Sequence, residues 1–576
     1  MMRKYLFSIA LLSIFALFSW WLMSSTFGYH NGMITIASKL RSDFGAHIPL
    51  IRSFSLGSNF PPQYPFYVGE PIRYHYLFYL AVGMLERFGV RIDLALNLLS
   101  ALGFTLLLSM IYAYGKTFFR SRATGILAVI LFLFNGSLSW IEYFSTKGWN
   151  VESLLAIPMQ TQFASFGPWS KGLVSAFWNW NIFTNQRHLG LSYGLLLLLL
   201  YPLVVFASAK KTKKNQWRKK IKSLLRGAIA AVEKVSDRVG LAKHKKFSWW
   251  YAPLVLGFAI FPLLHQAAFI ILLPLTIIWC ILALPLSKPH ILVFVAAVSA
   301  AMLVFLNLTP ESSSLPVWQV GYLSPSKTLL DLNWYWFMNL GLYWLLLPAL
   351  LIWSAKKRVW WLWTALPFFI LANLFRFSTD MINNHKLVTF FMIALNIVMA
   401  GFLVAVIKKI RFFGLLLLPA VFLLIFSGLM DVFPVINDVR GEFPDWRSSA
   451  IETWIVENTD PHAQFLPASY LYNPASLAGR YLYLDYGYHA WSMGYNDAHK
   501  RSLLPTLWSA QPDPTSWCRL LRSENLDAII VGPNENEVED GRISVKNSYV
   551  VRELTPTYES NDGWRVWMTE EICQNI

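Results

Sequence analysis

The chain has 576 residues, of which 55% are hydrophobic, 16% aromatic and only 14% charged. A soluble protein of this length carries about a quarter charged residues. Several apolar runs approach or exceed the ~18 residues that cross a bilayer core of about 30 Å. The composition therefore excludes a soluble globular protein and predicts an α-helical polytopic membrane protein.

Much of the net charge of +17 lies in one segment, Lys210–Lys246, which holds fourteen Lys or Arg residues and two acidic residues. In a membrane protein such a segment is typical of a cytoplasmic loop, and it also suits anionic lipid headgroups. We therefore predict a basic cytoplasmic loop over residues 209–248. A nucleic-acid partner is not expected, because no base-reading motif accompanies the charge.

The apolar runs predict about eleven transmembrane helices. They cover residues 5–24, 92–115, 123–141, 189–208, 249–264, 267–284, 290–308, 334–354, 359–375, 387–407 and 412–430. The first run follows Arg3 and Lys4 and is long for a signal peptide, with no small-residue cleavage site after it, so we expect it to be retained.

The segment Tyr74–Phe88 is apolar enough to be a span but short. If it is instead an interfacial helix on the outer face, every cluster of basic residues between spans falls on the cytoplasmic side. This agreement predicts a multi-pass protein of the inner or plasma membrane with a cytoplasmic N-terminus. The transmembrane part, residues 1–430, then precedes an extracytoplasmic C-terminal part.

Residues 436–576 differ in composition from the rest of the chain. They contain more Asp, Glu, Asn, Pro and Ser, with a short apolar strand pattern at Ala528–Val531 and a helical pattern at Ser448–Glu457. About 140 residues are enough for a separate core, so we predict a small α/β domain. Cys518 and Cys573 both lie in it, and the sequence leaves open whether they pair.

The first external loop, residues 25–91, contains the strongest candidate for chemistry. Asp43 and His47 are four residues apart, so in a helix they share one face. A carboxylate beside an imidazole, sheltered by the aromatic residues that follow, suits a general base. The alternative is that Asp43 only caps a helix outside the membrane.

A second cluster lies at the outer start of a span, within Trp178–His188. Aromatic rings can cover sugar faces, the Gln186 amide can bond hydroxyls, and Arg187 offers a planar fork to phosphate. His188 ends the cluster. The alternative is an aromatic interface belt in which Arg187 is an anchor.

A third cluster, Asn373–Lys386, places Arg376 and Lys386 at the outer ends of two consecutive spans. Paired cations there suit an anionic lipid headgroup, although snorkelling toward lipid phosphates is the alternative. His265 lies in a tight turn between two spans and is a further candidate phosphate donor, or a structural histidine.

These motifs together resemble a known superfamily. An acid in the first external loop, the Pro-Pro-x-x-Pro-aromatic element Pro61–Phe66, and Gly69-Glu70-Pro71 before Tyr74-His75-Tyr76 are similar to the polytopic GT-C glycosyltransferases. The nearest branch is the set of bacterial and archaeal membrane proteins named for a Tyr-Tyr-Tyr motif, with protein mannosyltransferase and aminoarabinose transferase types more distant. The resemblance covers residues 1–430, and His75 departs from the Tyr-Tyr-Tyr motif.

The resemblance implies transfer of a sugar from a polyprenyl-phosphate donor to a glycan, lipid or protein acceptor on the outer face, with inversion. Asp43 would be the catalytic carboxylate, acting as base or, with His47, as ligand of a divalent metal ion. The residues implied in substrate binding are His47, Arg73, Tyr74, His75, Tyr76, Gln186, Arg187, His188, His265, Arg376, Asp380, Asn384 and Lys386.

The competing interpretation is a transporter, flippase or scaffold of envelope glycolipid assembly without catalytic activity. Such a protein is expected to carry polar residues in mid-span, broken helices and repeat symmetry. The apolar spans, with charges at their ends, favour a transferase that works at the outer surface.

Single cysteines introduced at positions 500 and 225 test the predicted orientation. We expect a membrane-impermeant maleimide to label position 500 in intact cells and position 225 only after permeabilisation. The reverse labelling pattern would overturn both the orientation and the placing of the candidate residues on the outer face.

Overall fold

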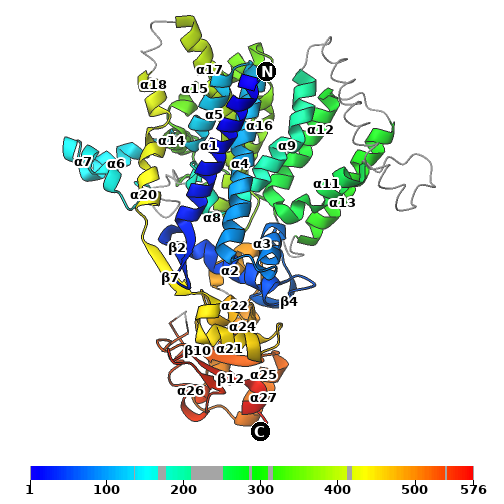
Figure 1. Ribbon diagram of the computed structural model, residues 1–576, viewed down its shortest axis with the longest axis vertical. Coiled ribbons are helices and arrows are strands. Elements are labelled where there is room, and N and C mark those ends of the chain that lie inside the picture. The colour runs from blue at the N-terminus through cyan, green and yellow to red at the C-terminus, as the bar shows by residue number, and fades with distance from the viewer. Residues whose placement is uncertain are drawn as a thin grey trace.

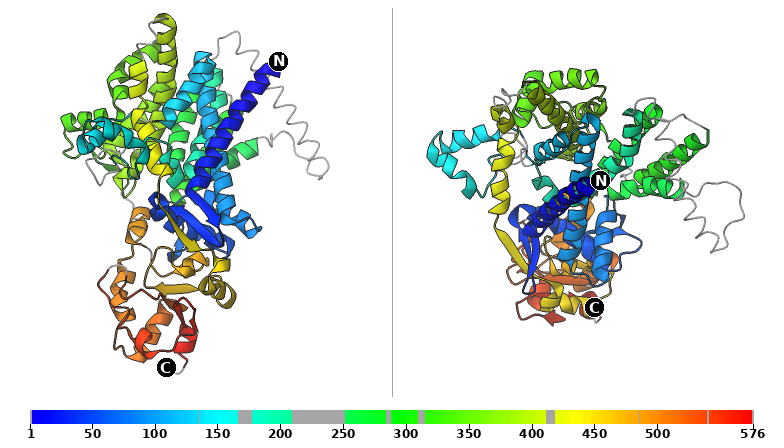
Figure 2. Two further views of the ribbon diagram at one scale, coloured as in Figure 1. Left: turned by 60° about the vertical axis from the view of Figure 1, so that its left-hand side comes forward. Right: turned by 45° about the horizontal axis from the view of Figure 1, so that its top comes forward.

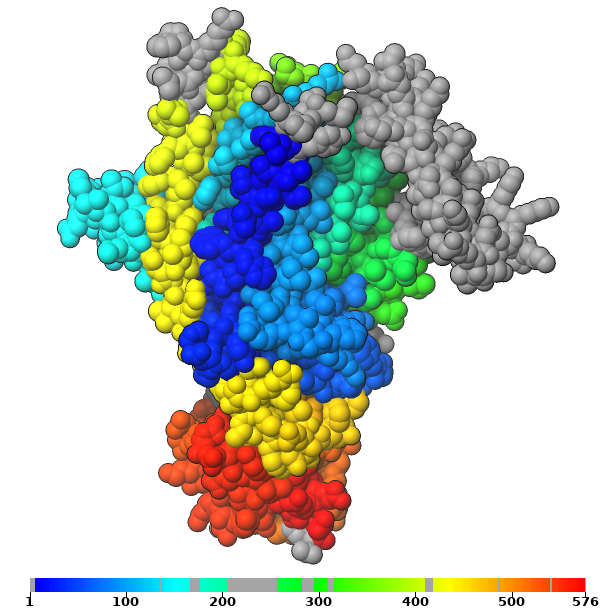
Figure 3. Space-filling view, viewed as in Figure 1, coloured from blue at the N-terminus to red at the C-terminus, as the bar shows by residue number. Residues whose placement is uncertain are grey.

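A computed structural model describes residues 2–134, 136–165, 177–208, 251–283, 288–308, 315–410, 418–484, 486–538 and 541–574. The predicted basic loop, 209–248, lies outside these residues. The helical bundle forms the broad upper part of the molecule and the C-terminal region forms the narrow lower end (Figures 1 and 3). The N-terminus lies at the far end of the bundle from the C-terminus (Figure 1).

The predicted apolar runs form helices. They are α1 (Met2–Thr26), α4 (Ile92–Phe119), α5 (Arg122–Leu133), α9 (His188–Ser208), α11 (Tyr251–Leu264), α12 (Gln266–Ala283), α13 (Lys288–Leu308), α16 (Trp361–Leu374) and α17 (His385–Ile410). Within the described residues, four stretches are long and apolar enough to span a membrane: Leu6–Thr26, Ile92–Phe119, His188–Val205 and Met381–Lys409. The count of about eleven spans stays a prediction.

One expected span, 334–354, is not a continuous helix. Its residues fall in α14 (Leu329–Leu340) and α15 (Leu342–Lys356), which meet at an angle of 95°. Gly341 joins them with a φ of +54°, and a Cβ there would lie 2.2 Å from the Gly136 carbonyl oxygen. The two helices together are long and apolar enough for one broken span, so the expected span stays a prediction.

Two other expected spans are interrupted. The run 123–141 ends its helix at Leu133, and α6 (Ser139–Lys147) begins after a break. In the run 412–430 the described part divides into α18 (Leu418–Leu423) and α19 (Phe426–Met430). The remaining short elements of the bundle and its loops are α7 (Val151–Leu155), η2 (Ile157–Met159), α8 (Asn181–Asn185), β5 (Val317–Trp318), β6 (Phe375–Arg376), η4 (Met381–Asn384) and α20 (Val432–Ile436).

The first loop folds into a compact unit below the bundle (Figure 1). After the hairpin of β1 (Phe27–His30) and β2 (Met33–Ala37) come η1 (Ser38–Leu40), α2 (Arg41–Ser55), the hairpin of β3 (Gln63–Tyr64) and β4 (Tyr67–Pro71), and α3 (Leu77–Arg87). At 11 residues, α3 is about 16 Å long and too short to cross a bilayer. It packs closely on α2, since a Cβ at Gly83 would lie 2.7 Å from the Ile51 carbonyl oxygen.

The C-terminal region is tied to the first loop through a shared sheet. Strand β7 (Arg440–Pro444) pairs antiparallel with β2, giving the order β1-β2-β7. Further contact comes at Gly45 of α2, where a Cβ would lie 2.7 Å from the side chain of Leu471. The views in Figure 2 likewise show the C-terminal region against the first loop.

A five-stranded mixed sheet forms the centre of this region, in the order β11-β12-β10-β8-β9. Its strands are β8 (Gln464–Pro467), β9 (Tyr481–Leu482), β10 (Ala528–Val531), β11 (Tyr558–Glu559) and β12 (Arg565–Met568). The accompanying helices are η6 (Trp446–Ser448), α21 (Ala450–Asn458), α22 (Pro474–Leu477), α23 (Gly487–Met493), α24 (Ala498–Leu507), α25 (Pro514–Ser523), α26 (Tyr549–Glu553) and α27 (Thr569–Ile572). Cys518 and Cys573, whose pairing the sequence left open, form a disulfide.

A buried ion cluster joins α2, α3 and the C-terminal region. Arg52, near the end of α2, lies 2.5 Å from Asp445 and 3.3 Å from Glu86 of α3, measured between side-chain nitrogen and oxygen. Ser55 donates a hydrogen bond of 2.7 Å to Glu86. The Arg52 side chain is only 2% exposed, so its charge depends on these two carboxylates rather than on water.

Replacing Arg52 with Met should strongly destabilise the protein. Methionine retains most of the volume but leaves two carboxylates buried without a cation, which costs about 3–5 kcal/mol. We expect a fall of several degrees in the thermal unfolding temperature of the detergent-solubilised protein. The control is Arg501→Met, which breaks the more exposed pair with Asp497 at 2.6 Å and should cost about 0–1 kcal/mol. Equal losses in the two variants would contradict the role given to Arg52.

Candidate functional site

Asp43 lies in the first turn of α2, at the surface where the first loop meets the C-terminal region. It makes no side-chain capping bond to the helix, and its carboxylate is half-buried. Burial raises the pKa of Asp43, and the positive charges of His489 and Lys386 act against this rise. The carboxylate is therefore within charge range of Lys386 and His489, which are hundreds of residues away in sequence.

Lys386 reaches this surface from the start of α17. Its side chain is buried, and its Nζ donates a 3.1 Å hydrogen bond to Asn383 Oδ1. An ammonium carries three N–H donors, so two of them have no protein acceptor among the described residues. The third cluster thus places a partly unsatisfied cation within charge range of Asp43.

Three histidines meet beside this pair. His75 Nε2 lies 2.8 Å from His188 Nε2, and the His265 ring is stacked on His75 with 4.4 Å between ring centroids. Burial, together with neighbouring His188 and His265, lowers the pKa of His75 well below its usual value. His75 is therefore neutral at physiological pH, and the cluster brings together one residue from each of three predicted segments.

His47 and Tyr79 form the next layer of the site. Their rings stack at 4.7 Å, and the Tyr79 hydroxyl lies 2.8 Å from His188 Nδ1. Burial lowers the pKa of His47 to about 3, with His489 and Arg187 adding to the effect, so His47 is neutral as well. His47 Nδ1 has no hydrogen-bond partner among the described residues, and no described bond joins it to Asp43.

Arg187 is buried but is already saturated with protein partners. Its guanidinium donates to the carbonyl oxygens of Thr184 and Met23 and to the side chains of Asn97 and Thr26, over 2.8–3.1 Å. Four of its five N–H groups are thereby used in joining α1, α4 and the α8–α9 turn. These contacts favour the alternative role of an anchor, and its expected role in phosphate binding stays a prediction.

Several other expected residues hold the frame of the site. Asn384 donates to the carbonyl oxygens of Ala372 and Phe375, at 2.9 and 2.6 Å, which fixes the ends of α16 and α17. Asp380 accepts a 3.1 Å bond from the Ile382 N–H and so caps η4. Both residues position the loop that carries Lys386.

The Gly-Glu-Pro motif contacts the C-terminal region rather than the histidines. Arg73 donates a 3.0 Å hydrogen bond to the Gly494 carbonyl oxygen and forms an ion pair of 2.8 Å with Glu70. Tyr74 packs on His75 with 3.7 Å between centroids, whereas the Tyr76 ring lies 6.1 Å from Phe54. Of the Tyr-His-Tyr triplet, the first two residues belong to the site.

Two expected polar residues have buried atoms without partners. The Nε of Arg376 and the Oε1 of Gln186 make no hydrogen bond among the described residues. Arg376 lies in β6, which pairs with β5 at Val317, so its backbone is fixed. Among the described residues neither atom forms a hydrogen bond or ion pair with Asp43 or the histidines, and their roles in substrate binding stay predictions.

The structure adds residues that the sequence did not single out. Tyr488 donates a 2.8 Å hydrogen bond to Asp380 Oδ2, and His489 lies within charge range of Asp43. Both come from α23, in an aromatic-rich stretch of the C-terminal region. Tyr79 lies in α3, four residues after His75. This spacing could have indicated from the sequence that Tyr79 belongs to the site.

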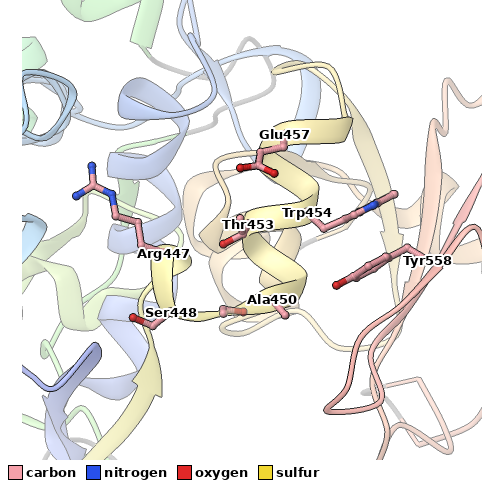
Figure 4. A pocket seen from close by; sticks show the side chains of 8 residues that line it. Arg447, Ser448, Ala450, Thr453, Trp454, Glu457 and Tyr558 are labelled. Atoms are coloured by element: carbon pink, nitrogen blue, oxygen red, sulfur yellow. The ribbon is translucent and has the colours of Figure 1, made fainter.

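A separate cavity of about 380 Å³ lies in the C-terminal region, between α21 and β11 (Figure 4). Trp454 and Tyr558 stack across it with 4.6 Å between centroids, while Arg447 points away from it in Figure 4. Thr453 and Glu457 also line it. This cavity shares no residue with the cluster around Asp43.

One segment of the chain matches the model of a protein family. Residues 46–184, from α2 to α8, match the model of a family described as "Uncharacterized membrane protein (DUF2298)". Over this segment the chain resembles a family of membrane proteins. The prediction of a membrane protein is thus confirmed, with Asp43 lying just before the matched segment. No curated protein sequence matches the chain.

Two solved structures of archaeal oligosaccharyltransferases are similar to the chain. The apo enzyme of Archaeoglobus fulgidus has a TM-score of 0.41 and 14% identity, over 91% of this chain and 69% of that one. AglB of the same organism, in complex with an inhibitory peptide and a dolichol-phosphate, has a TM-score of 0.41 and 13% identity, over 92% and 69%.

Proposed function

We propose that this protein is a multi-pass glycosyltransferase of the plasma membrane. It transfers a sugar from a polyprenyl-phosphate donor to an acceptor hydroxyl on the outer face. The observation that supports this most directly is the meeting of Asp43 with Lys386: a half-buried carboxylate and a buried, partly unsatisfied ammonium share one surface. The first can serve as a base and the second can hold a phosphate.

The proposed reaction is a single displacement. Asp43 takes the proton of the acceptor hydroxyl as the acceptor oxygen forms a bond to the anomeric carbon. The bond from that carbon to the phosphate oxygen breaks, and the electron pair leaves with the polyprenyl phosphate. The charge that develops on this oxygen is stabilised by the N–H donors of Lys386, because preorganised donors act most strongly where charge appears. Attack opposite the leaving group inverts the anomeric carbon.

Neutral histidines suit the surroundings of such a reaction. Burial keeps the His47 and His75 rings uncharged, so their nitrogens can donate or accept hydrogen bonds near the reacting groups. The chain's own residues thus supply one fixed cation and one base. A divalent metal ion, expected at Asp43 and His47 from the resemblance, is not needed for the proton transfer described.

The outward orientation receives support from the disulfide. Cys518 and Cys573 are both buried, and their pairing requires an oxidising compartment such as the periplasm or cell exterior. Asp43 lies on the first loop, which pairs with the C-terminal region through β2 and β7. If the disulfide-bearing region is outside, the candidate site is outside as well.

The transporter alternative gains one feature from the fold. The bent pair α14 and α15 is a broken helix of the kind that transporters use. The break brings Gly341 against Gly136, however, and within the described residues no hydrogen bond or ion pair connects Gly341 with Asp43 or Lys386. A purely transporting protein would also have no need of a base at the surface, and the following variant separates the two functions.

Asp43→Asn should abolish sugar transfer while leaving membrane insertion intact. The amide keeps the size and polarity of the side chain but cannot accept the proton, and loss of a general base costs ~10²–10⁴ in rate. The measurement is transfer from a panel of radiolabelled polyprenyl-phosphate sugars in membranes that contain each variant. Asp93→Asn is the matched control, since Asp93 also lies in the first turn of a helix but pairs with Arg91.

The pH dependence provides a second test of Asp43. A base must be ionised, and burial raises the pKa of Asp43, so activity should fall as pH drops through a value above the usual 3.9 or so of an aspartate. This acid limb should vanish in the residual activity of Asp43→Asn. Near wild-type turnover in that variant would mean that Asp43 has no catalytic role.

Lys386→Met should impair use of the donor more than use of the acceptor. A charged hydrogen bond to phosphate in a dehydrated site contributes ~1.5–3 kcal/mol, so kcat/KM for the donor should fall tenfold or more. Lys327→Met is a control that also removes an ammonium, one on an exposed residue that donates a 2.5 Å hydrogen bond to the Tyr322 carbonyl oxygen. Unchanged donor kinetics in Lys386→Met would make Lys386 an interface anchor.

A further inference from the structure

Three buried histidines form a set with the geometry of a metal site. His75 comes from the loop before α3, His188 begins α9, and His265 lies between α11 and α12. One ring nitrogen from each lies within 4.8 Å of the others. The side chains are 2%, 0% and 0% exposed. Three separate parts of the chain thus bring their ring nitrogens together at one buried position.

The protein alone does not satisfy these rings. His75 Nδ1 and His265 Nε2 are buried without a hydrogen-bond partner among the described residues. A buried polar atom without a partner is unfavourable, and packing three imidazoles at centroid distances of 4.4, 4.4 and 5.1 Å concentrates that penalty in one place. A cation that accepts one lone pair from each of the three rings would offset this penalty.

The donor set selects the kind of metal. Three imidazole nitrogens suit Zn²⁺ and neighbouring transition metals, whereas Mg²⁺ and Ca²⁺ require oxygen ligands. Asp43, whose carboxylate was expected as a metal ligand, is not part of this set. We infer that His75, His188 and His265 bind a zinc-class divalent ion, with the fourth position of a tetrahedron open.

Contacts around the cluster indicate what must adjust on binding. Tyr79 lies 2.8 Å from His188 Nδ1 and can orient that ring so that Nε2 faces the ion. Zn–N bonds of about 2.0–2.1 Å place tetrahedral ligands about 3.3 Å apart, so the 2.8 Å contact between His75 and His188 widens. If His265 binds the ion through Nε2, that nitrogen loses its proton and Nδ1 carries it instead. Nδ1 can then no longer accept the 3.1 Å hydrogen bond from the Ala268 N–H.

The fourth ligand is expected to carry negative charge. The Lys386 ammonium faces all three histidines, so a divalent ion there is repelled unless an anion accompanies it. Hydroxide meets this need without any substrate. The site therefore stands whether or not the protein transfers sugar.

The experiment is zinc binding by the purified, detergent-solubilised chain after treatment with a chelator. We expect about one Zn²⁺ per chain by mass spectrometry after dialysis, with no retention of Mg²⁺. His188→Gln and His265→Gln should each weaken zinc binding at least tenfold. The matched control is His385→Gln, since His385 is equally buried and lies outside the set. Wild-type zinc affinity in His188→Gln and His265→Gln would overturn the proposal.

A second measurement on the unaltered chain guards against variants that fail to fold. Zinc-edge X-ray absorption should show imidazole scattering from about three ligands at ~2.0 Å. Addition of zinc should also raise the thermal unfolding temperature of the wild type, since a ligand bound only by the native state stabilises it. Zinc without imidazole scattering, or no zinc retained, would overturn the proposal.

Discussion

The buried charge of Arg52 is the constraint on which the candidate site depends. Arg52 lies about two and a half turns beyond Asp43 on α2 and is held by Glu86 of α3 and by Asp445 after β7. A buried guanidinium without its carboxylates would cost several kcal/mol, so α2 has one position relative to both partners. Because Asp43 and Arg52 belong to the same helix, fixing Arg52 also constrains where Asp43 lies.

The site is assembled from segments that are far apart in the sequence yet share one end of the bundle. The first loop supplies Asp43 and His75, the starts of α9 and α17 supply His188 and Lys386, and α23 brings His489. Ionisable groups at the ends of spans avoid the dehydration penalty of the bilayer centre. The same ends contact the C-terminal region, for example through the hydrogen bond from Tyr488 to Asp380.

Local sequence patterns predicted what depends on local physics. Hydropathy located the apolar helices, and the four-residue spacing of Asp43 and His47 correctly placed both on α2. Hydropathy did not predict the turn at Gly341. Gly341 is in close contact with Gly136, which lies about 200 residues away in the sequence. Nor did hydropathy predict the acceptors of Arg187, because a long side chain is satisfied by whatever folding brings near it.

The contrast between Arg187 and Lys386 shows why cations at span ends cannot be assigned a role from position alone. Both are buried near the start of a helix, and both were candidates for phosphate. Arg187 donates four hydrogen bonds to the protein, so a phosphate would have to displace them. Lys386 donates one, to Asn383, and keeps the rest of its capacity facing a carboxylate and neutral imidazoles. A cation that the fold leaves unsatisfied is the one whose burial needs a ligand to explain it.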